Sequence, residues 1–219
     1  MDHREILQLS DDVASTKPPA DRDGARVRAV HRLGPQRNPA IDTAILEATR
    51  TLLVERGYDG TSIDAIATES GVGRPTIYRR WRSKAHIVHD AIYPSIEPAD
   101  VGPGDFSARI GLLIAGAYAL FGQPAARAGV PGLMAATRSD QELRQRLVTE
   151  QLDPVRAALR HMLDEGIASG EVRADTDVDT LLDAIAGAAI FALGVRDEAD
   201  PAEHAAALTA LLLQGITVR

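Results

Sequence analysis

Helical periodicity runs through most of this chain and constrains its fold more than any other feature. From Ala40 onward, apolar residues recur three or four positions apart in one segment after another. No stretch alternates between apolar and polar residues as a half-buried strand would, and the sequence contains no internal repeat. We therefore predict an all-α protein, and 219 residues are enough to bury the core that such a fold needs.

Start and stop signals divide the first part of this pattern into four predicted helices. These helices are expected at about residues 40–56, 61–70, 75–80 and 83–93. Gly57 stops the first helix, and Thr61 is expected to cap the second in a capping box with Asp64. Residues 71–73 read Gly-Val-Gly and predict a tight turn, after which Pro75 suits the first turn of a short third helix. A compact module of short helices therefore occupies residues 39–93.

The remainder of the chain predicts a larger helical domain. Residues 94–104 contain three prolines and two glycines, so we interpret them as the connection between the two domains. Beyond it, helices are expected over residues 106–122, in a segment interrupted at 129–132, from Ser139 to Ser169, and over 177–194 and 201–215. Ser139 and Glu142 have the spacing of a second capping box. The predicted domains are thus an arm at 1–38, the module at 39–93 and a helical domain at 94–219.

Charge is distributed unevenly along the chain. Residues 22–84 contain 12 Lys or Arg and 7 Asp or Glu, a balance of +5 in a chain whose net charge is −7. A basic segment joined to an acidic body is typical of a small DNA-reading module on a larger domain. Residues 1–38 have few large apolar residues after Leu9 but carry five arginines from Arg22 onward. They are expected to form a flexible basic arm that reaches a DNA groove or phosphates, or else to be a disordered leader or the product of a wrongly assigned start site.

Several classes of protein are disfavoured by what the sequence lacks. It contains no cysteine, which excludes disulfides and thiolate metal sites. It also has no run of 18 apolar residues, which disfavours a membrane-spanning helix. The first ten residues do not have the pattern of a secretory signal, so we expect a soluble cytoplasmic protein without a membrane partner. His86 and His89 could place two metal ligands on one helix face. Because no metalloprotease, phosphate-loop or nucleophile-elbow motif accompanies them, we predict no enzymatic activity, no metal and no cofactor.

Residues 61–84 carry the functional motif, TSIDAIATESGVGRPTIYRRWRSK. Two short helices flank the Gly-Val-Gly turn, as in a helix-turn-helix whose second helix enters the major groove. Ile77 can point inward while four neighbours point outward, with side chains suited to base edges and phosphates. The four outward residues are Arg74, Thr76, Tyr78 and Arg79. Thr61 and Lys84 stand near the starts of their helices, where backbone N–H groups favour a phosphate.

This arrangement resembles the TetR-type repressors. The resemblance covers residues 40–93 and depends on the spacing of Thr61, Gly71, Tyr78, Trp81 and Lys84. It implies that the four outward residues face the major groove or its flanking phosphates, and that Thr61 and Lys84 clamp the DNA backbone. His86 departs from the pattern, since many relatives have an acidic residue in the first turn of this helix, and we expect the departure to weaken the helix cap slightly.

The second half resembles the family in its helical layout alone. The last two predicted helices are rich in alanine and glycine, which permits close helix approach, and the resemblance implies a homodimer through them. Such a dimer would bind a palindromic operator in double-stranded DNA and be released by a small apolar effector. Candidate residues for its pocket are Leu112, Tyr118, Phe121, Met134, Leu159, Met162 and Phe191, each of which could equally be core. A helical interaction protein without specific DNA binding is the alternative, and activation rather than repression stays open.

Overall fold

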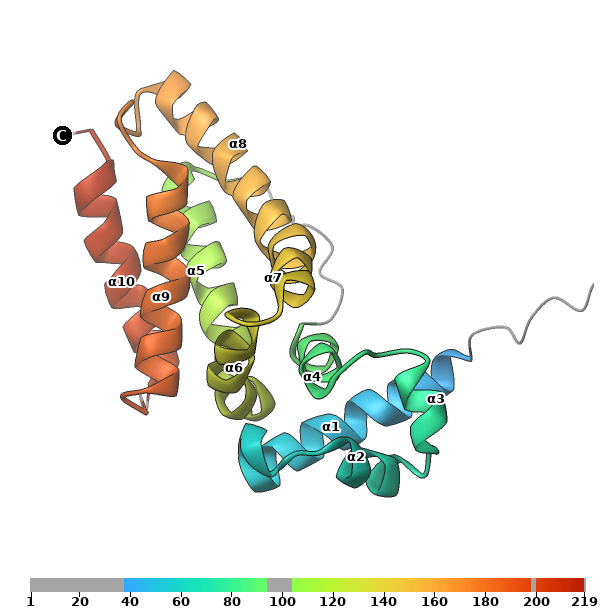
Figure 1. The fold of residues 1–219 in the computed structure, drawn as a ribbon. Helices are drawn as coiled ribbons and strands as arrows, with labels where there is room; N and C mark the ends of the chain where they lie inside the picture. Colours follow the sequence, from blue (N-terminus) through green and yellow to red (C-terminus); the bar gives the residue numbers. More distant parts are fainter. Residues whose placement is uncertain (1–37, 94–103, 198–199, 219) are drawn as a thin grey trace, which may run out of the picture. The chain divides into compact units, whose positions relative to one another are not determined.

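A computed structural model of the chain describes residues 38–93, 104–197 and 200–218. In these residues the secondary structure is helical apart from one isolated bridge between Val172 and Thr217, so the predicted all-α fold is confirmed (Figure 1). The helices are α1 (Pro39–Gly60), α2 (Ile63–Ser70), α3 (Arg74–Tyr78), α4 (Lys84–Ile92), α5 (Phe106–Gly122), α6 (Pro124–Thr137), α7 (Gln141–Leu147), η1 (Val148–Leu152), α8 (Asp153–Ser169), α9 (Val178–Gly194) and α10 (Pro201–Ile216). The expected basic arm and most of the expected connection between domains lie outside the described residues.

Two of the predicted helix caps are wrong by one residue. Ser62, not Thr61, caps α2, and its hydroxyl accepts a hydrogen bond from the backbone N–H of Ala65 at 3.1 Å. Thr61 instead donates its hydroxyl to the carbonyl of Gly57 at 2.8 Å, where α1 breaks with a φ of 69°. In the same way Asp140, not Ser139, caps α7. In both pairs the first side chain bonds back to the preceding helix, which leaves its neighbour to cap the next one.

The expected interruption at residues 129–132 is also wrong, because α6 continues through this segment with Pro131 inside it. The two glycines there serve a different purpose, which is close packing. A Cβ atom on Gly129 would lie 2.6 Å from Cδ1 of Ile92, and one on Gly132 would lie 2.2 Å from the ring of Tyr58. Glycine therefore allows α6 to approach α1 and α4 closely.

The single long helix predicted from Ser139 to Ser169 is divided into three parts. Its middle, η1, is a π-helical turn in which the N–H of Asp153 donates to the carbonyl of Val148, five residues earlier. Pro154 follows at once and has no N–H to donate, so a regular α-helical ladder cannot pass through this point. Gly170 ends α8 with a φ of 79°, as predicted.

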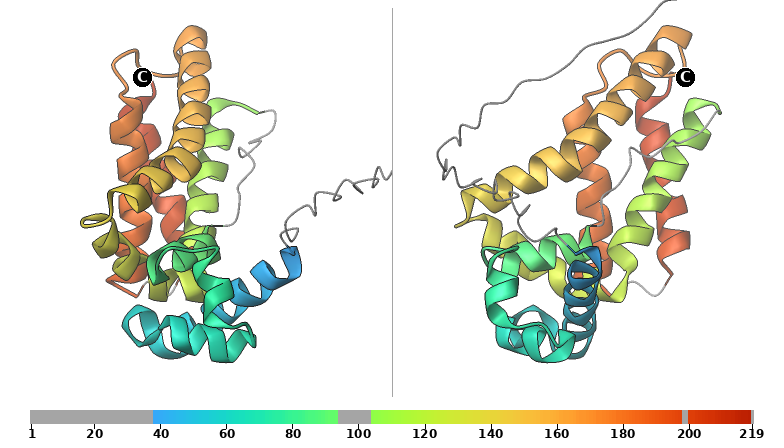
Figure 2. Two further views of the ribbon diagram at one scale, coloured as in Figure 1. Left: turned by 45° about the vertical axis from the view of Figure 1, so that its right-hand side comes forward. Right: turned by 90° about the vertical axis from the view of Figure 1, so that its right-hand side faces the viewer.

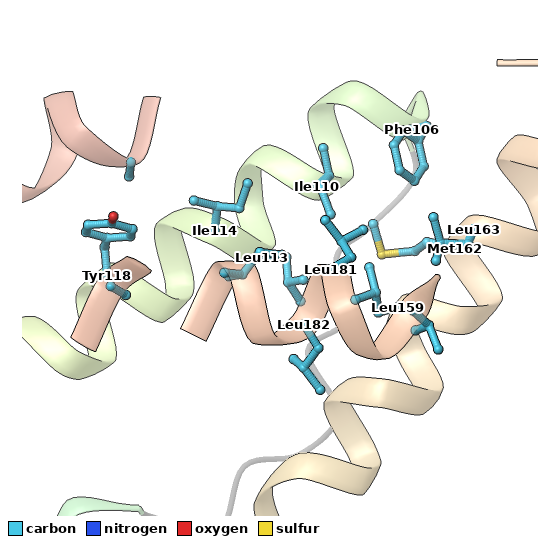
Figure 3. Close-up of a cluster of buried hydrophobic side chains, with 14 of the residues drawn as sticks. Phe106, Ile110, Leu113, Ile114, Tyr118, Leu159, Met162, Leu163, Leu181 and Leu182 are labelled. Carbon is cyan, nitrogen blue, oxygen red and sulfur yellow. The ribbon is translucent and has the colours of Figure 1, made fainter. Parts of the chain in front are cut away.

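Three groups of buried apolar side chains hold these helices together. The first joins α5, α8, α9 and α10, and Figure 3 shows Ile110, Leu159 and Met162 within it. Helices α5, α9 and α10 run alongside one another in both views of Figure 2. The second group joins α1 and α4 to α6 and α7. The third group packs the four helices α1, α2, α3 and α4 against one another. In the described part of the chain no single helix is both long and apolar enough to cross a membrane.

Candidate nucleic-acid interface

Three buried isoleucines pack helix α3 against α1 and α2. Ile45 of α1, Ile66 of α2 and Ile77 of α3 are fully buried in one cluster. Between α2 and α3 the chain turns at Gly71, which has a φ of 68° and favours a residue without Cβ. Because Ile77 anchors α3 from within, the remaining side chains of this helix are left at or near the surface. Helices α2 and α3 therefore have the arrangement of a helix-turn-helix.

Three of the predicted DNA-contacting residues are exposed. Arg74 and Tyr78 stand four residues apart on α3 and share a face, with Tyr78 55% exposed. Arg74 forms an exposed ion pair with Asp64 of α2 at 2.6 Å. Arg79 is exposed, and among the described residues nothing forms an ion pair or hydrogen bond with its side chain. Thr76 is half-buried. This face thus presents two guanidinium groups and a phenol to solvent.

The other two predicted contacts, Thr61 and Lys84, lie differently. Thr61 is only 1% exposed and its hydroxyl is used within α1, so its assignment as a phosphate contact is corrected to a structural role. The neighbouring Ser62 is exposed at the start of α2, and the sequence reasoning missed it. Lys84 donates from Nζ to the carbonyl of Tyr58 at 2.8 Å, and the same nitrogen lies 4.1 Å from the centre of the Tyr58 ring. Its partial burial lowers the pKa of Lys84, although Asp59 acts in the opposite direction.

The remaining arginines near α3 are paired with carboxylates. Arg80 is largely buried in an ion pair with Asp42 of α1, and Arg82 pairs with Glu142 of α7 at the surface. Residues 39–93 as a whole contain seven Lys or Arg and seven Asp or Glu. The module therefore has no net charge, and its positive face arises from where a few cations are placed.

Behind α3, a buried tryptophan is hydrogen-bonded to a partly buried carboxylate that the sequence did not reveal. Trp81 is 3% exposed, and its Nε1 donates to Oδ2 of Asp90 at 2.7 Å. Burial opposes ionisation of Asp90, but hydrogen bonds from His89 and Trp81 together with the charge of Arg146 prevail and lower its pKa. A carboxylate two residues before the end of a largely buried helix was the available signal, since such a group needs partners.

The two histidines of α4 are buried within the packing around this site. Nδ1 of His86 lies 2.9 Å from the Ser83 hydroxyl at the start of α4, and Nδ1 of His89 lies 2.9 Å from Oδ1 of Asp90. Ser83 stands at the cap position, as predicted, but its side chain does not cap the helix because it faces His86. No group of three or more potential metal ligands occurs in the described ranges.

The seven candidate pocket residues do not surround one space. Tyr118, Leu159 and Met162 are buried in the core of the bundle (Figure 3), and Phe121 is half-buried. Leu112, Met134 and Phe191 are exposed, because residue type alone does not fix which face of a helix a side chain occupies. A groove of about 700 Å³ runs between α5 and α10. It is lined mainly by glycine and alanine, and Tyr118 is the one candidate among its lining residues.

Comparisons with known proteins agree with this geometry. The profile described as bacterial regulatory proteins, tetR family, matches residues 45–91, and that of the tetracyclin repressor-like C-terminal domain matches residues 103–212. The HTH-type transcriptional regulator YdeS of Bacillus subtilis is 28% identical over 73% of this chain and 81% of YdeS. The DNA-binding transcriptional repressor TetR of Mycobacteroides abscessus is 30% identical over 61% of this chain and 72% of the repressor.

Among solved structures, the regulator FadR of Bacillus subtilis in complex with stearoyl-CoA has the same fold. It is 21% identical and covers 80% of this chain and 98% of FadR, with a TM-score of 0.57. The family profiles together span both the helix-turn-helix and the larger helical part. The chain therefore belongs to the TetR family of bacterial DNA-binding transcriptional regulators.

Proposed function

We propose that this regulator is a homodimeric repressor that binds a palindromic operator through α3 and leaves it when a small apolar ligand binds among the later helices. The observation that carries the proposal is the exposed face of α3, where Arg74, Tyr78 and Arg79 surround the buried anchor Ile77. Arginine can donate two hydrogen bonds to a guanine edge, and the Tyr hydroxyl can reach a base or a phosphate.

The pairing of Arg74 and Lys84 within the protein is compatible with DNA contact. A guanidinium has five N–H donors and an ammonium has three, so one bond to Asp64 or to the Tyr58 carbonyl leaves others for a phosphate or a base. Thr76 completes the set on α3, and Ser62 replaces Thr61 as the candidate phosphate contact at the start of α2.

The dimer is proposed to form through α9 and α10. Phe191 on α9 and Leu211 on α10 are exposed large apolar side chains, and exposed alanines such as Ala206, Ala207 and Ala210 accompany them. Apolar surface with small side chains suits a self-complementary contact between helices. A twofold pair of α3 helices would then meet two half-sites about one DNA turn apart.

The ligand is proposed to be a small apolar molecule. FadR, which has this fold, binds stearoyl-CoA, whose long acyl chain is apolar. We place the ligand of this chain among the buried apolar side chains of α5, α8, α9 and α10. Such a ligand releases DNA only if it binds the DNA-free form more tightly than the DNA-bound form. Because the protein would act on DNA, we propose that it is cytoplasmic, and we propose no enzymatic activity for it.

The test is selection of genomic fragments on the purified protein, followed by mobility shifts of the recovered DNA at defined salt. We expect a short palindrome bound at least about 1000-fold more tightly than bulk DNA, in the usual range of specificity ratios. Sedimentation of the complex would show two chains on each palindrome. Weak binding that moderate salt abolishes, from protein shown to carry no small molecule, would refute the proposal and favour a helical interaction protein.

A further inference from the structure

A cluster of polar side chains lies where α4 meets both the end of α3 and α7. Asp90 of α4 accepts from Nε1 of Trp81 at 2.7 Å through Oδ2, while its Oδ1 lies 3.0 Å from Nη2 of Arg146 on α7. Nδ1 of His89 is 2.9 Å from the same Oδ1. Asp90 is therefore the shared partner of a residue that follows the recognition helix and a residue of the later helical part.

Trp81 is positioned to transmit this constraint to α3. Its backbone N–H donates to the carbonyl of Ile77 at 2.9 Å, and its side chain packs in the same buried cluster as Ile77 and Ile45. The indole therefore packs against the end of α3. An apolar contact alone would tolerate small sliding movements, whereas a short N–H···O bond to a carboxylate fixes direction as well as distance.

We propose that Asp90 is a positioning residue for DNA recognition, which fixes the pose of α3 by holding Trp81 and Arg146 together. The inference rests on the proposed role of α3 in reading DNA. It makes Arg146 part of the DNA-reading machinery, although Arg146 lies 68 positions beyond the end of α3 at Tyr78. No contact between Asp90 and DNA is required.

The other partner of Arg146 suggests how the later helices act on this cluster. Nε of Arg146 donates to Oε1 of Glu150 at 2.8 Å, and Glu150 belongs to the π-helical turn η1. Single π-helical turns are frequently found at functional sites. Glu150 and Asp90 bind different nitrogens of Arg146, so a shift of η1 would move the guanidinium relative to Asp90. Through Asp90 and Trp81 this shift would change the pose of α3.

The sequence offers a direct probe, because Trp81 is the only tryptophan of the chain. The first experiment compares the DNA-free full-length protein with Arg146→Gln, which does not touch the indole. Arg156→Gln is the matched control, since Arg156 pairs with Asp153 and Asp179 at the surface and has no bond to the cluster. We expect Arg146→Gln to shift the emission maximum of Trp81 and increase its quenching by acrylamide, and Arg156→Gln to change neither.

The second experiment measures affinity for the DNA duplex selected on the wild-type protein. Arg146→Gln should weaken it about tenfold, the loss typical of one charge-assisted hydrogen bond. In a Trp81→Phe background, which keeps an aromatic ring but removes the N–H donor, Arg146→Gln should have much less effect. Urea midpoints of all variants exclude unfolding as the cause.

Each outcome is decisive. If Trp81 emission and DNA affinity are unchanged in Arg146→Gln, or if the effects of the two substitutions on affinity simply add, the positioning role of Asp90 is refuted. If the fluorescence coupling is present but no duplex is bound specifically, the proposed function fails, and with it the DNA-recognition role assigned to Asp90, while the Trp81–Asp90–Arg146 coupling itself stands.

Discussion

Replacement of Gly132 by alanine tests the contact between the helix-turn-helix and the larger helical part. A Cβ atom at this position would lie 2.2 Å from both Cγ and Cδ1 of Tyr58 and 2.7 Å from its Cβ. These atoms form the root of the aromatic side chain, so a rotation at the tip cannot remove the overlap. Lys84 also restrains Tyr58, because its Nζ donates a hydrogen bond to the Tyr58 carbonyl and lies over the Tyr58 ring.

Two opposing effects determine the expected change in the free energy of unfolding. Alanine within a helix is about 1 kcal/mol more favourable than glycine. Overpacking a tight contact costs about 1–3 kcal/mol, and separations this short place Gly132→Ala at the upper end. The net expectation is destabilisation by about 2 kcal/mol. Displacement of Tyr58 would also disturb Lys84, so affinity for the selected duplex should fall as well.

The assay is urea denaturation at one protein concentration, with Gly116→Ala as the matched control. Gly116 lies within α5, and a Cβ there would meet nothing within 4 Å. This control should gain up to about 1 kcal/mol from helix propensity alone. If Gly132→Ala is as stable as Gly116→Ala, the close approach of α1 and α6 at Tyr58 does not exist in solution, and the reasoning is refuted.

Three further predictions concern DNA binding and acid stability. Arg79→Ala should weaken binding of the selected duplex by about 1–3 kcal/mol but barely affect a scrambled duplex, and mobility shifts showing equal weakening for both would remove Arg79 from base recognition. Deletion of residues 1–37, which carry six Arg or Lys from Lys17 onward, should lower the salt slope of binding by about 0.9 for each phosphate that this segment neutralises, and an unchanged slope would exclude its contact with DNA. Because its partners lower the pKa of Asp90, its ionised form stabilises the fold above the unfolded-state value of about 3.9, and this contribution disappears as pH falls through the folded-state pKa. Urea denaturation should therefore show the stability difference between wild type and Asp90→Asn shrinking in acid, and a constant difference would contradict the assignment.

Helices with unambiguous start signals could be predicted closely from the sequence. Asp177 and Asp200 cap α9 and α10, and Pro201 occupies the first turn of α10, so both helices begin within a residue of the expected positions. Where two capping residues are adjacent, as at Thr61 and Ser62, local patterns do not decide between them. The preceding helix decides, because it takes the first hydroxyl as a donor to its own last turn.

Features that depend on distant parts of the chain could not be predicted in this way. Gly129 and Gly132 have the local signature of a break, but they are required by the approach of Ile92 and Tyr58 to α6. Similarly, Leu112 and Met162 are both plausible pocket residues by type, whereas only packing against other helices places one at the surface and the other in the core.

The charge balance of residues 39–93 gives positioning a particular importance in this regulator. With seven cationic and seven acidic side chains, the module exerts little net attraction on DNA at a distance. Its affinity is then expected to come from a few cations placed in contact, and two of the proposed contacts, Arg74 and Lys84, already have partners in Asp64 and Tyr58. Fixed side chains lose less entropy on binding, so they favour the sequence that fits them over DNA in general. A small rotation of α3 would therefore lower the DNA affinity of such a module more than that of a strongly basic one. For this reason a single carboxylate behind α3, that of Asp90, is expected to affect DNA binding through the pose of this helix.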